Sequence, residues 1–423
     1  MEKIIKRDGR EVAFNKDKIE EAILRAFVSV DGDVSEYAEQ KAEKIADFIE
    51  EAAIETEEPY TVEEIQDMVE KGLMSTKRKD VAKAYILYRE ERNKMRNFND
   101  SRTQAMREKL LARNIENQNA NVDESSFGGR KGEADSIIMK NFALDYCMSK
   151  KSRENHLNNE IYIHDLDSYA VGMHNCLTIP FDDLLANGFN TRQTDVRPAN
   201  SVNTAFQLVA VIFQLQSLQQ FGGVSASHLD WTMVPYVRKS FNKHLKDGIK
   251  YIQKGVYASS GRFPAHSDKI EEIPIDHERY KFQGPAYEYA MEMTEREVKQ
   301  AVEGMYHNLN TLQSRSGNQL PFTSINYGTC TLPEGRMITK ALLEGCIKGV
   351  GKLHKTSIFP CGIFQYMKGV NDKPGTPNYD LYRLALKSTA KRLYPNYANV
   401  DWSGNAGYDR NDPRTYFSTM GLA

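Results

Sequence analysis

The sequence predicts an α/β fold that follows a mostly helical N-terminal region. Two observations support this prediction. From about residue 136 onward, helical patterns alternate with short apolar or β-branched runs, an alternation typical of a central sheet covered by helices. Before residue 96, apolar residues recur mainly at helical spacing. The 423 residues are enough for two or three domains with a sizeable core.

Residues 1–95 are interpreted as a first domain. The run IIKRDGREVAF indicates two short strands around a turn at Asp8-Gly9. Thr61 and Glu64 have the spacing of a capping box and mark the start of a helix. Helices are predicted, in order, over residues 19–30, over 34–56, from 61 onward and around 81–95.

Residues 96–135 are polar and rich in Asn, Arg and Glu, and we interpret them as a linker. Residues 136–423 are expected to carry the sheet. A long apolar helix is predicted over roughly Thr204–Gln220, ending before a Gly-Gly pair. Strands are expected in the runs IYIH (Ile161–His164), CLTIP, TSINYGTC (Thr323–Cys330) and TSIFPCGIF (Thr356–Phe364).

Composition excludes several classes of function. Lys and Arg number 56 against 58 Asp and Glu, a net charge of -2, which argues against a nucleic-acid-binding protein. No run of about 18 apolar residues could span a membrane. The N-terminus MEKIIKRDGREV is too charged for a secretory signal, so a cytoplasmic location is expected. The five cysteines are irregularly spaced without a C-x-x-C pair, which indicates reduced thiols and no structural zinc site.

Five segments resemble blocks of one enzyme family. They are NANVDESSFGGR, IYIHDLDSYAVGMHNC, DVRPANSVNTAFQ, QFGGVSASHLDW and PRTYFSTMG. The family is that of the anaerobic (class III, glycyl-radical) ribonucleoside-triphosphate reductases. The resemblance implies that residues 136–423 form the N-terminal half of a ten-stranded α/β barrel. It also implies radical-based reduction of ribonucleoside triphosphates to deoxyribonucleoside triphosphates.

Cys176 is the first candidate for a catalytic residue. It is a lone cysteine just past a predicted strand, in the frame HNCLTIP. A free cysteine is otherwise most often a small buried apolar residue. The resemblance implies that Cys176 lies beside the bound ribose and takes part in reduction at the 2'-carbon. We therefore expect its thiol to face a sugar-sized cavity.

The first domain resembles the ATP-cone, a regulatory nucleotide-binding module. Lys6 and Arg7 lie beside the predicted tight turn, and Lys18 lies on the next helix. These cations could converge on the triphosphate of ATP or dATP, the allosteric effectors that the resemblance implies. The alternative is a solvated basic surface.

Gln207 and Gln214 lie seven residues apart on the long apolar helix and share a stripe. A helix that is apolar nearly all round must be buried on several sides. The resemblance implies a homodimer interface beside a specificity-effector site. The alternative is an ordinary core helix with satisfied glutamines.

The sequence places further polar and sulfur-bearing side chains near predicted strands. His164, Asp165 and Asp167 have metal-ligand chemistry, but strand alternation would send His164 and Asp165 to opposite faces, so hydrogen bonding is favoured. Asn326 is a candidate for substrate contact. The remaining cysteines are interpreted as core or packing residues: Cys147, Cys330, Cys346 and Cys361.

The C-terminal region departs from the family pattern. Leu422 stands where the family has its thiyl-radical cysteine, and no R-V-x-G-Y segment or four-cysteine zinc site occurs; Gly407-Tyr408 is interpreted as a loop. The isolated chain is therefore expected to be inactive and to self-associate through exposed apolar surface. Its implied partners are an iron–sulfur, S-adenosylmethionine-dependent activase and a separate C-terminal half. The alternative is a nucleotide-sensing regulatory fragment without catalytic activity.

Overall fold

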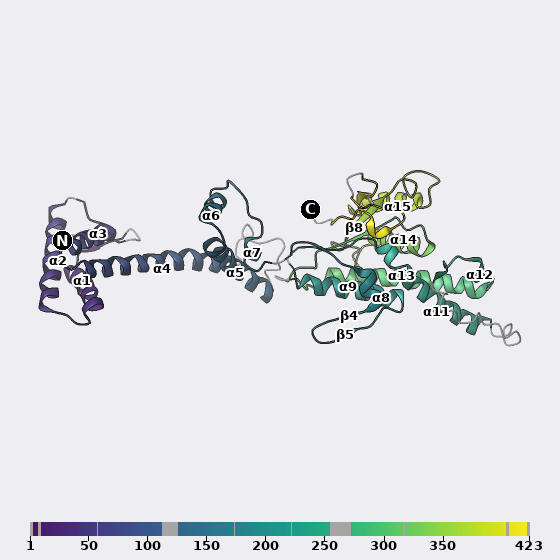
Figure 1. The fold of residues 1–423 in the computed structure, drawn as a ribbon, viewed down its shortest axis with the longest axis horizontal. Coiled ribbons are helices and arrows are strands. Elements are labelled where there is room, and N and C mark those ends of the chain that lie inside the picture. The colour runs from purple at the N-terminus through teal and green to yellow at the C-terminus, as the bar shows by residue number, and fades with distance from the viewer. Residues whose placement is uncertain are drawn as a thin grey trace. The chain divides into compact units, whose positions relative to one another are not determined.

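The structure, a computed structural model, describes most of the chain. It covers residues 3–6, 10–56, 58–111, 126–172, 174–220, 222–253, 272–315, 318–402 and 406–420, without the side chains of 95–103, 107–109 and 111. The chain divides into two compact units, Met1–Arg107 and Glu108–Ala423. Each unit has a hydrophobic core of its own, and Figure 1 labels most of the helices of both units.

The first unit is a small helical bundle with a two-stranded hairpin. Its elements are β1 (Lys3–Ile5), β2 (Glu11–Ala13), α1 (Lys16–Asp31), α2 (Glu36–Glu55), α3 (Val62–Ser75) and α4 (Lys79–Leu111). The backbone N–H of Ile5 donates to the carbonyl of Tyr60 at 2.9 Å, which ties the hairpin to the start of α3. The two strands and four helices predicted for this region are confirmed.

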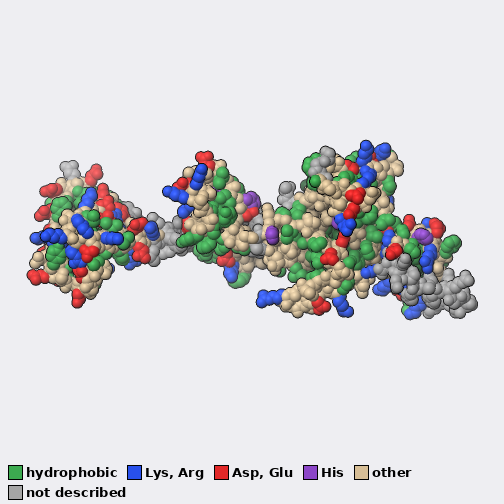
Figure 2. All heavy atoms as spheres, viewed as in Figure 1, with side chains coloured by type: hydrophobic (Ala, Val, Ile, Leu, Met, Phe, Trp, Pro, Cys, Tyr) green, Lys and Arg blue, Asp and Glu red, His purple; other side chains and the backbone are tan. Residues whose placement is uncertain are grey.

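Local signals explain where these helices begin. Asn15, Ser35 and Thr61 each accept a hydrogen bond from a backbone N–H three residues later. The predicted capping box of Thr61 and Glu64 is present. Acidic and basic side chains are interspersed over the visible face of this unit (Figure 2). Its apolar stripes meet in one core, which includes Ile23, Phe27, Ala46, Ile49, Leu73 and Val81.

The second unit is built around a five-stranded parallel sheet. In spatial order the strands are β3 (Leu177–Thr178), β6 (Val224–Ala226), β7 (Thr323–Tyr327), β8 (Cys361–Tyr366) and β9 (Asn396–Asn399). All four neighbouring pairs are parallel. Parallel neighbours need crossover connections, and these connections contain helices, so the predicted α/β class is confirmed. The strands predicted in the CLTIP, TSINYGTC and TSIFPCGIF runs are also confirmed.

The remaining elements surround this sheet. Before it come α5 (Phe127–Phe142), a π-helical turn (Ala143–Cys147), α6 (Lys150–Leu157) and α7 (Leu166–Tyr169). The hairpin β4 (Phe189–Asn190) and β5 (Asp195–Val196) and the short 3₁₀ turn Pro413–Thr415 lie outside the sheet. The other helices are α8 (Phe181–Asn187), α9 (Val202–Ser217), α10 (Leu229–Thr232), α11 (Val234–Ile252), α12 (Glu278–Lys281), α13 (Pro285–Thr311), α14 (Pro333–Lys348) and α15 (Tyr379–Arg392).

The two faces of the sheet differ in what covers them. Successive side chains of a strand point to opposite faces. One face carries core residues, among them Ile325, Tyr327 and Phe364, which belong to the same hydrophobic core as buried residues of α9, α11 and α13. The other face carries polar side chains from the alternate positions of the same strands, and the segment near residue 419 bonds to it.

The structure corrects one predicted strand. Ile161–His164 is not a strand, because residues in the left-handed region bracket it, Asn159 at φ 59° and Asp165 at φ 55°. The backbone N–H of Ile163 donates to the ring of His156 at 3.2 Å instead of to a neighbouring strand.

The segment interpreted as a linker, 96–135, contains the end of α4 and the beginning of α5, and its residues 112–125 lie outside the described part of the chain. Among the helices that the structure describes, none is both long enough and apolar enough to cross a lipid bilayer.

Candidate functional site

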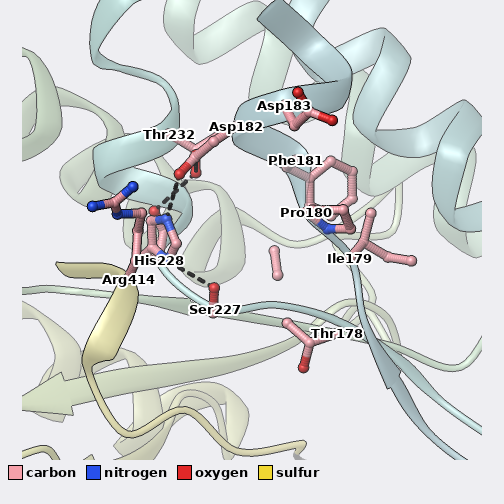
Figure 3. Close-up of a pocket in the computed structure, with 11 residues that line it drawn as sticks. Thr178, Ile179, Pro180, Phe181, Asp182, Asp183, Ser227, His228, Thr232 and Arg414 are labelled. Carbon is pink, nitrogen blue, oxygen red and sulfur yellow. Dashed lines mark hydrogen bonds and ion pairs between the residues drawn. The ribbon is translucent and has the colours of Figure 1, made fainter. Parts of the chain in front are cut away.

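A cavity of about 380 Å³ lies where β3 and β6 end. Ligands of open parallel sheets commonly bind at the carboxyl ends of strands. One wall is apolar and comes from the segment that joins β3 to α8, whereas the other wall carries polar side chains that follow β6 (Figure 3). The lining residues are Thr178, Ile179, Pro180, Phe181, Asp182, Asp183, Ala226, Ser227, His228, Thr232 and Arg414.

A chain of hydrogen bonds crosses the polar wall. Figure 3 shows His228 between Asp182 and Ser227. The Nε2 atom of His228 lies 2.8 Å from Oδ2 of Asp182, and its Nδ1 atom lies 2.7 Å from Oγ of Ser227. The hydroxyl of Thr232 donates to the other carboxylate oxygen of Asp182 at 2.5 Å. Asp182 is therefore held from two sides by residues that follow β6.

The charge of Asp182 fixes the proton positions in this chain. Burial pushes the pKa of Asp182 upward, but the hydrogen bonds from His228 and Thr232 outweigh burial, so the pKa lies below the ordinary value. A carboxylate can only accept, so Nε2 of His228 carries a proton. With the proton on Nε2, Nδ1 of the neutral ring accepts a hydrogen bond from the hydroxyl of Ser227. The arrangement can hold or relay a proton between Ser227 and Asp182.

Arg414 reaches this cavity from the C-terminal segment (Figure 3). Its guanidinium donates to Asp412 at 2.8 Å and also lowers the pKa of Asp182 through its charge. Asp182, His228 and Arg414 also line a second cavity of about 400 Å³. Lys239 lines the second cavity but not the first. The pairing of Asp182 with His228 is not predictable from the sequence, because the two residues are 46 positions apart.

Cys176 is exposed and lines neither cavity. Its Sγ atom lies 3.7 Å from Oδ1 of Asn175. The backbone here approaches Gly222 so closely that a Cβ at Gly222 would lie 1.6 Å from the carbonyl oxygen of Asn175. The glycine that precedes β6 is therefore required by the close approach of the chain around Cys176.

Strand alternation places Cys176 on the polar face of the sheet. Cys176 directly precedes β3 and stands two positions before Thr178, so the alternation of β3, continued by one residue, gives both side chains the same side. Thr178 is paired with Ser225 of β6, whose hydroxyl donates to the carbonyl of Thr419 at 3.5 Å. The thiol and the C-terminal segment therefore share one side of the sheet.

Arg315 lies close to Cys176. The guanidinium is 3.9 Å from the ring centre of Phe322, and burial lowers its pKa. The carboxylates of Asp165 and Asp167 oppose that shift through their negative charge. Sequence reasoning missed Arg315, since it lies far along the chain from these carboxylates and from Cys176.

The predicted hydrogen bonding of the HDLD segment is confirmed. Nδ1 of His164 contacts the carboxylate of Asp165, and the hydroxyl of Ser136 donates to Asp167 at 2.9 Å. The prediction that His164 and Asp165 point to opposite faces is wrong, because the segment forms a turn at Asp165 instead of a strand. Within the described ranges, no group of three His, Cys, Asp or Glu side chains could hold a metal ion.

The other cysteines separate into two kinds. Cys330, Cys346 and Cys361 are buried, as predicted. Burial raises the pKa of each of these thiols. Cys147 is exposed, so its interpretation as a packing residue is wrong; the helix widens into a π-helical turn there and presents the side chain to solvent. Asn326 is fully buried, and its side-chain amide bonds to the backbone of Thr419.

The nucleotide-site candidates lie in the first unit and on α9. Lys6 and Lys18 are exposed, and Arg7 lies outside the described residues, as does Leu422 at the other end of the chain. Gln207 is exposed, whereas Gln214 is half-buried and donates to the carbonyl of Asn308 in α13 at 3.4 Å. The predicted burial of this helix on several sides is confirmed, with an outer stripe that includes Val211 and Leu215 left exposed.

Comparisons with known proteins extend this picture. Residues 2–94 match the ATP cone domain, and residues 118–421 match the anaerobic ribonucleoside-triphosphate reductase family. The anaerobic ribonucleoside-triphosphate reductase of Salmonella typhimurium is 31% identical over 401 residues, which cover 94% of this chain and 51% of that protein. The Escherichia coli protein of the same name is 30% identical with the same coverage. The chain thus spans about half the length of these relatives.

Two further matches are weaker or shorter. The vitamin B12-dependent ribonucleoside-diphosphate reductase of Thermoplasma acidophilum is 44% identical over 101 residues, 23% of this chain and 12% of that protein. The crystal structure of the anaerobic ribonucleotide reductase from Thermotoga maritima in complex with dATP and CTP has a TM-score of 0.45 at 15% identity, covering 74% of this chain and 50% of that one. The family match over residues 118–421 includes the sheet, Cys176 and both cavities, and the chain belongs to the anaerobic ribonucleoside-triphosphate reductase family.

Proposed function

We propose that this chain is the N-terminal portion of an enzyme that reduces ribonucleoside triphosphates to deoxyribonucleoside triphosphates by radical chemistry. The family match over residues 118–421 carries the proposal. The net reaction replaces the 2'-hydroxyl of the ribose by hydrogen and releases water, so it consumes two electrons and two protons. An external reductant, formate or a small dithiol protein, must supply them.

Cys176 is the proposed catalytic residue of this chain. Its thiol would donate one hydrogen to the 2'-carbon, the 2'-hydroxyl would leave as water, and the external reductant would return a hydrogen to the sulfur. Support comes from its exposure, which leaves the thiol accessible, and from its place on the polar face of the sheet. The two cavities at the ends of β3 and β6 do not include it, so the ribose site would form against residues beyond those that line them.

The rest of the reaction would require a second half of the enzyme. That half would supply the thiyl cysteine, the zinc site and the glycyl radical. An iron–sulfur activase would generate the glycyl radical. The radical would then start the chemistry by hydrogen abstraction. The relatives' greater length supports this. Exposed apolar side chains in residues 126–172 also fit a surface that further protein covers, among them Phe127, Phe142, Tyr146, Leu157, Tyr162 and Val171 (Figure 2).

A reconstitution experiment tests the proposal. The chain alone, treated with activase, ATP and reductant, is expected to form no deoxynucleotide. Addition of a polypeptide that corresponds to the part of the relatives that this chain does not cover should restore formation, and Cys176→Ser should abolish it. Cys147→Ser, at another exposed cysteine, is the matched control and should remain active. Nucleotide binding without any restored reduction would favour the regulatory fragment over the enzyme.

The first unit is proposed to bind ATP and dATP as allosteric effectors through Lys6, Arg7 and Lys18. The ATP cone match over residues 2–94 supports this. Loss of one charge-assisted hydrogen bond should weaken binding about tenfold. Calorimetric titration of Lys6→Ala and Arg7→Ala should show that loss, whereas Lys3→Ala should not, because Lys3 is already paired with Glu11 at 3.0 Å. Unchanged affinity in the first two variants would contradict the assignment.

The outer stripe of α9 is proposed as a homodimer interface, with Gln207 and Gln214 near a specificity effector. Exposed Val211 and Leu215 on this helix, and exposed Leu218 directly after it, support the proposal. Sedimentation of Leu215→Lys should show a shift toward monomer relative to the unmodified chain. An unchanged sedimentation profile would exclude this stripe as the contact.

A further inference from the structure

Three polar side chains on adjacent strands converge on the C-terminal segment. Ser225 of β6, Asn326 of β7 and Gln365 of β8 are each at most 1% exposed. Each stands beside core residues of the same strand that point the other way, so all three lie on the polar face. Buried polar groups without partners are costly. All three side chains donate to backbone carbonyls of residues 417–419, whereas Oε1 of Gln365 is buried and has no hydrogen-bond partner in the described part of the chain.

Asn326 binds Thr419 as one peptide group binds another. Its Nδ2 donates to the carbonyl oxygen of Thr419 at 3.0 Å, and its Oδ1 accepts from the backbone N–H of Thr419 at 3.1 Å. The same Nδ2 donates to the carbonyl of Ala226 at 3.0 Å and to the hydroxyl of Ser225 at 3.2 Å. Ser225 and Ala226 of β6 therefore fix the orientation of the Asn326 side chain, and in this orientation it bonds to Thr419.

Gln365 provides a second contact two residues away. Its Nε2 donates to the carbonyl of Phe417 at 3.1 Å and to that of Ser227 at 3.2 Å. The contacts to Phe417 and Thr419 use their backbone atoms alone. Just before them, Tyr416 is buried in a small cluster with Met367 and Val400, which anchors the start of the segment.

We propose that Asn326 and Gln365 are positioning residues that hold the backbone of residues 417–419 on the polar face of the sheet. The backbone of residues 417–419 is then fixed on the side of the sheet that carries Ser225, Asn326 and Gln365. These hydrogen bonds to the backbone do not depend on the proposed reduction, so either proposal can be wrong while the other holds. The competing explanation is that Asn326 only joins β6 to β7 through Ala226.

Hydrogen exchange of the full chain, followed by mass spectrometry, separates these explanations. Asn326→Asp keeps the size and one acceptor but loses the donor to Thr419. We expect exchange in residues 413–420 to accelerate about tenfold, the change for one lost hydrogen bond, while α15 is unaffected. Asn378→Asp is the matched control, because Asn378 is equally buried and donates to Gly328 and Cys330 instead. Unchanged exchange in residues 413–420, or equal acceleration throughout the chain, would overturn the proposal.

A second pair of variants leaves the sheet intact. Thr419→Pro removes the N–H that donates to Asn326, and Thr419→Ala removes only the side chain. The proline variant should loosen residues 413–420 as Asn326→Asp does, and the alanine variant should behave as the unmodified chain. If the alanine variant loosens the segment equally, the side chain and not the backbone is what the sheet holds, and the proposal is wrong.

Discussion

The two faces of the five-stranded sheet are made by the same strands but stabilised by different interactions. On one face, Phe364 and Tyr327 pack in an apolar core that includes helix side chains. On the other, Asn326 and Gln365 are just as deeply buried and bind backbone atoms of residues 417–419. Apolar packing tolerates substitutions that conserve volume, whereas the amide nitrogens of Asn326 and Gln365 need acceptors at fixed positions. The apolar face should therefore control the stability of the second unit, and the polar face should control where residues 417–419 lie.

The largest difference is expected between neighbouring residues of β8. Phe364→Ala should lower the free energy of unfolding by about 3–5 kcal/mol, because a fully buried aromatic ring is lost. Gln365→Leu should cost only about 1–2 kcal/mol, the range for hydrogen bonds lost at one side chain. Urea denaturation of both variants measures the difference. Equal losses would show that the faces contribute alike.

Gly222 tests the close approach that shapes the Cys176 region. Gly222→Ala should cost about 3 kcal/mol, since the new Cβ meets the Asn175 carbonyl at 1.6 Å. The control is Gly304→Ala in α13, where no atom lies within 4 Å of the added Cβ. That variant should gain about 0.5–1 kcal/mol, because alanine favours a helix. If thermal denaturation shows that both variants are as stable as the unmodified chain, the backbone around Cys176 can shift to accommodate the added Cβ.

The thiols offer a comparison of accessibility. In a Cys147→Ser background, Cys176 should react with iodoacetamide on the order of a hundredfold faster than Cys361. Cys176 is exposed, whereas Cys361 is 3% exposed and burial raises the pKa of its thiol. Peptide mapping after timed alkylation gives both rates. A slow Cys176 would mean that its side of the sheet is covered in solution.

The smallest effect is expected at Asp182, in the cavity where β3 and β6 end. The pKa of Asp182 is lower in the folded chain than its ordinary value of 3.8, so its ion contributes stability above that pH. The contribution is lost as pH falls through the lowered pKa. Because the side chain is 45% exposed, it should amount to less than about 1 kcal/mol.

Urea unfolding at several acidic pH values checks this sign. Asp182→Asn should flatten the decline in stability below pH 3.8 relative to the unmodified chain. The neighbouring Asp183→Asn is the control, because the carboxylate of Asp183 accepts from Asn187 instead of His228. A decline that is the same in all three proteins would exclude Asp182 as its source.

Elements that depend on near neighbours in the chain could be predicted from the sequence. The helices of the first unit follow from apolar spacing and from caps such as Thr61 with Glu64. The run IYIH has strand-like residues yet forms a turn, because its backbone bonds to residues of α6 and Asp165 adopts a left-handed conformation. Cys147 has a helical pattern around it but a π-helical turn exposes it. Residue type alone carries no signal for either outcome.

The sequence by itself determined the family, the α/β class and Cys176 as the candidate thiol, because these depend on motifs and on periods of two to four residues. Only the tertiary structure decided which polar residues meet. Asp182 reaches His228 and Asn326 reaches Thr419 across 46 and 93 positions, through strand crossovers that no local pattern encodes. Side chains on separate parallel strands become neighbours only when the sheet sets their register, and that register is a property of the whole core.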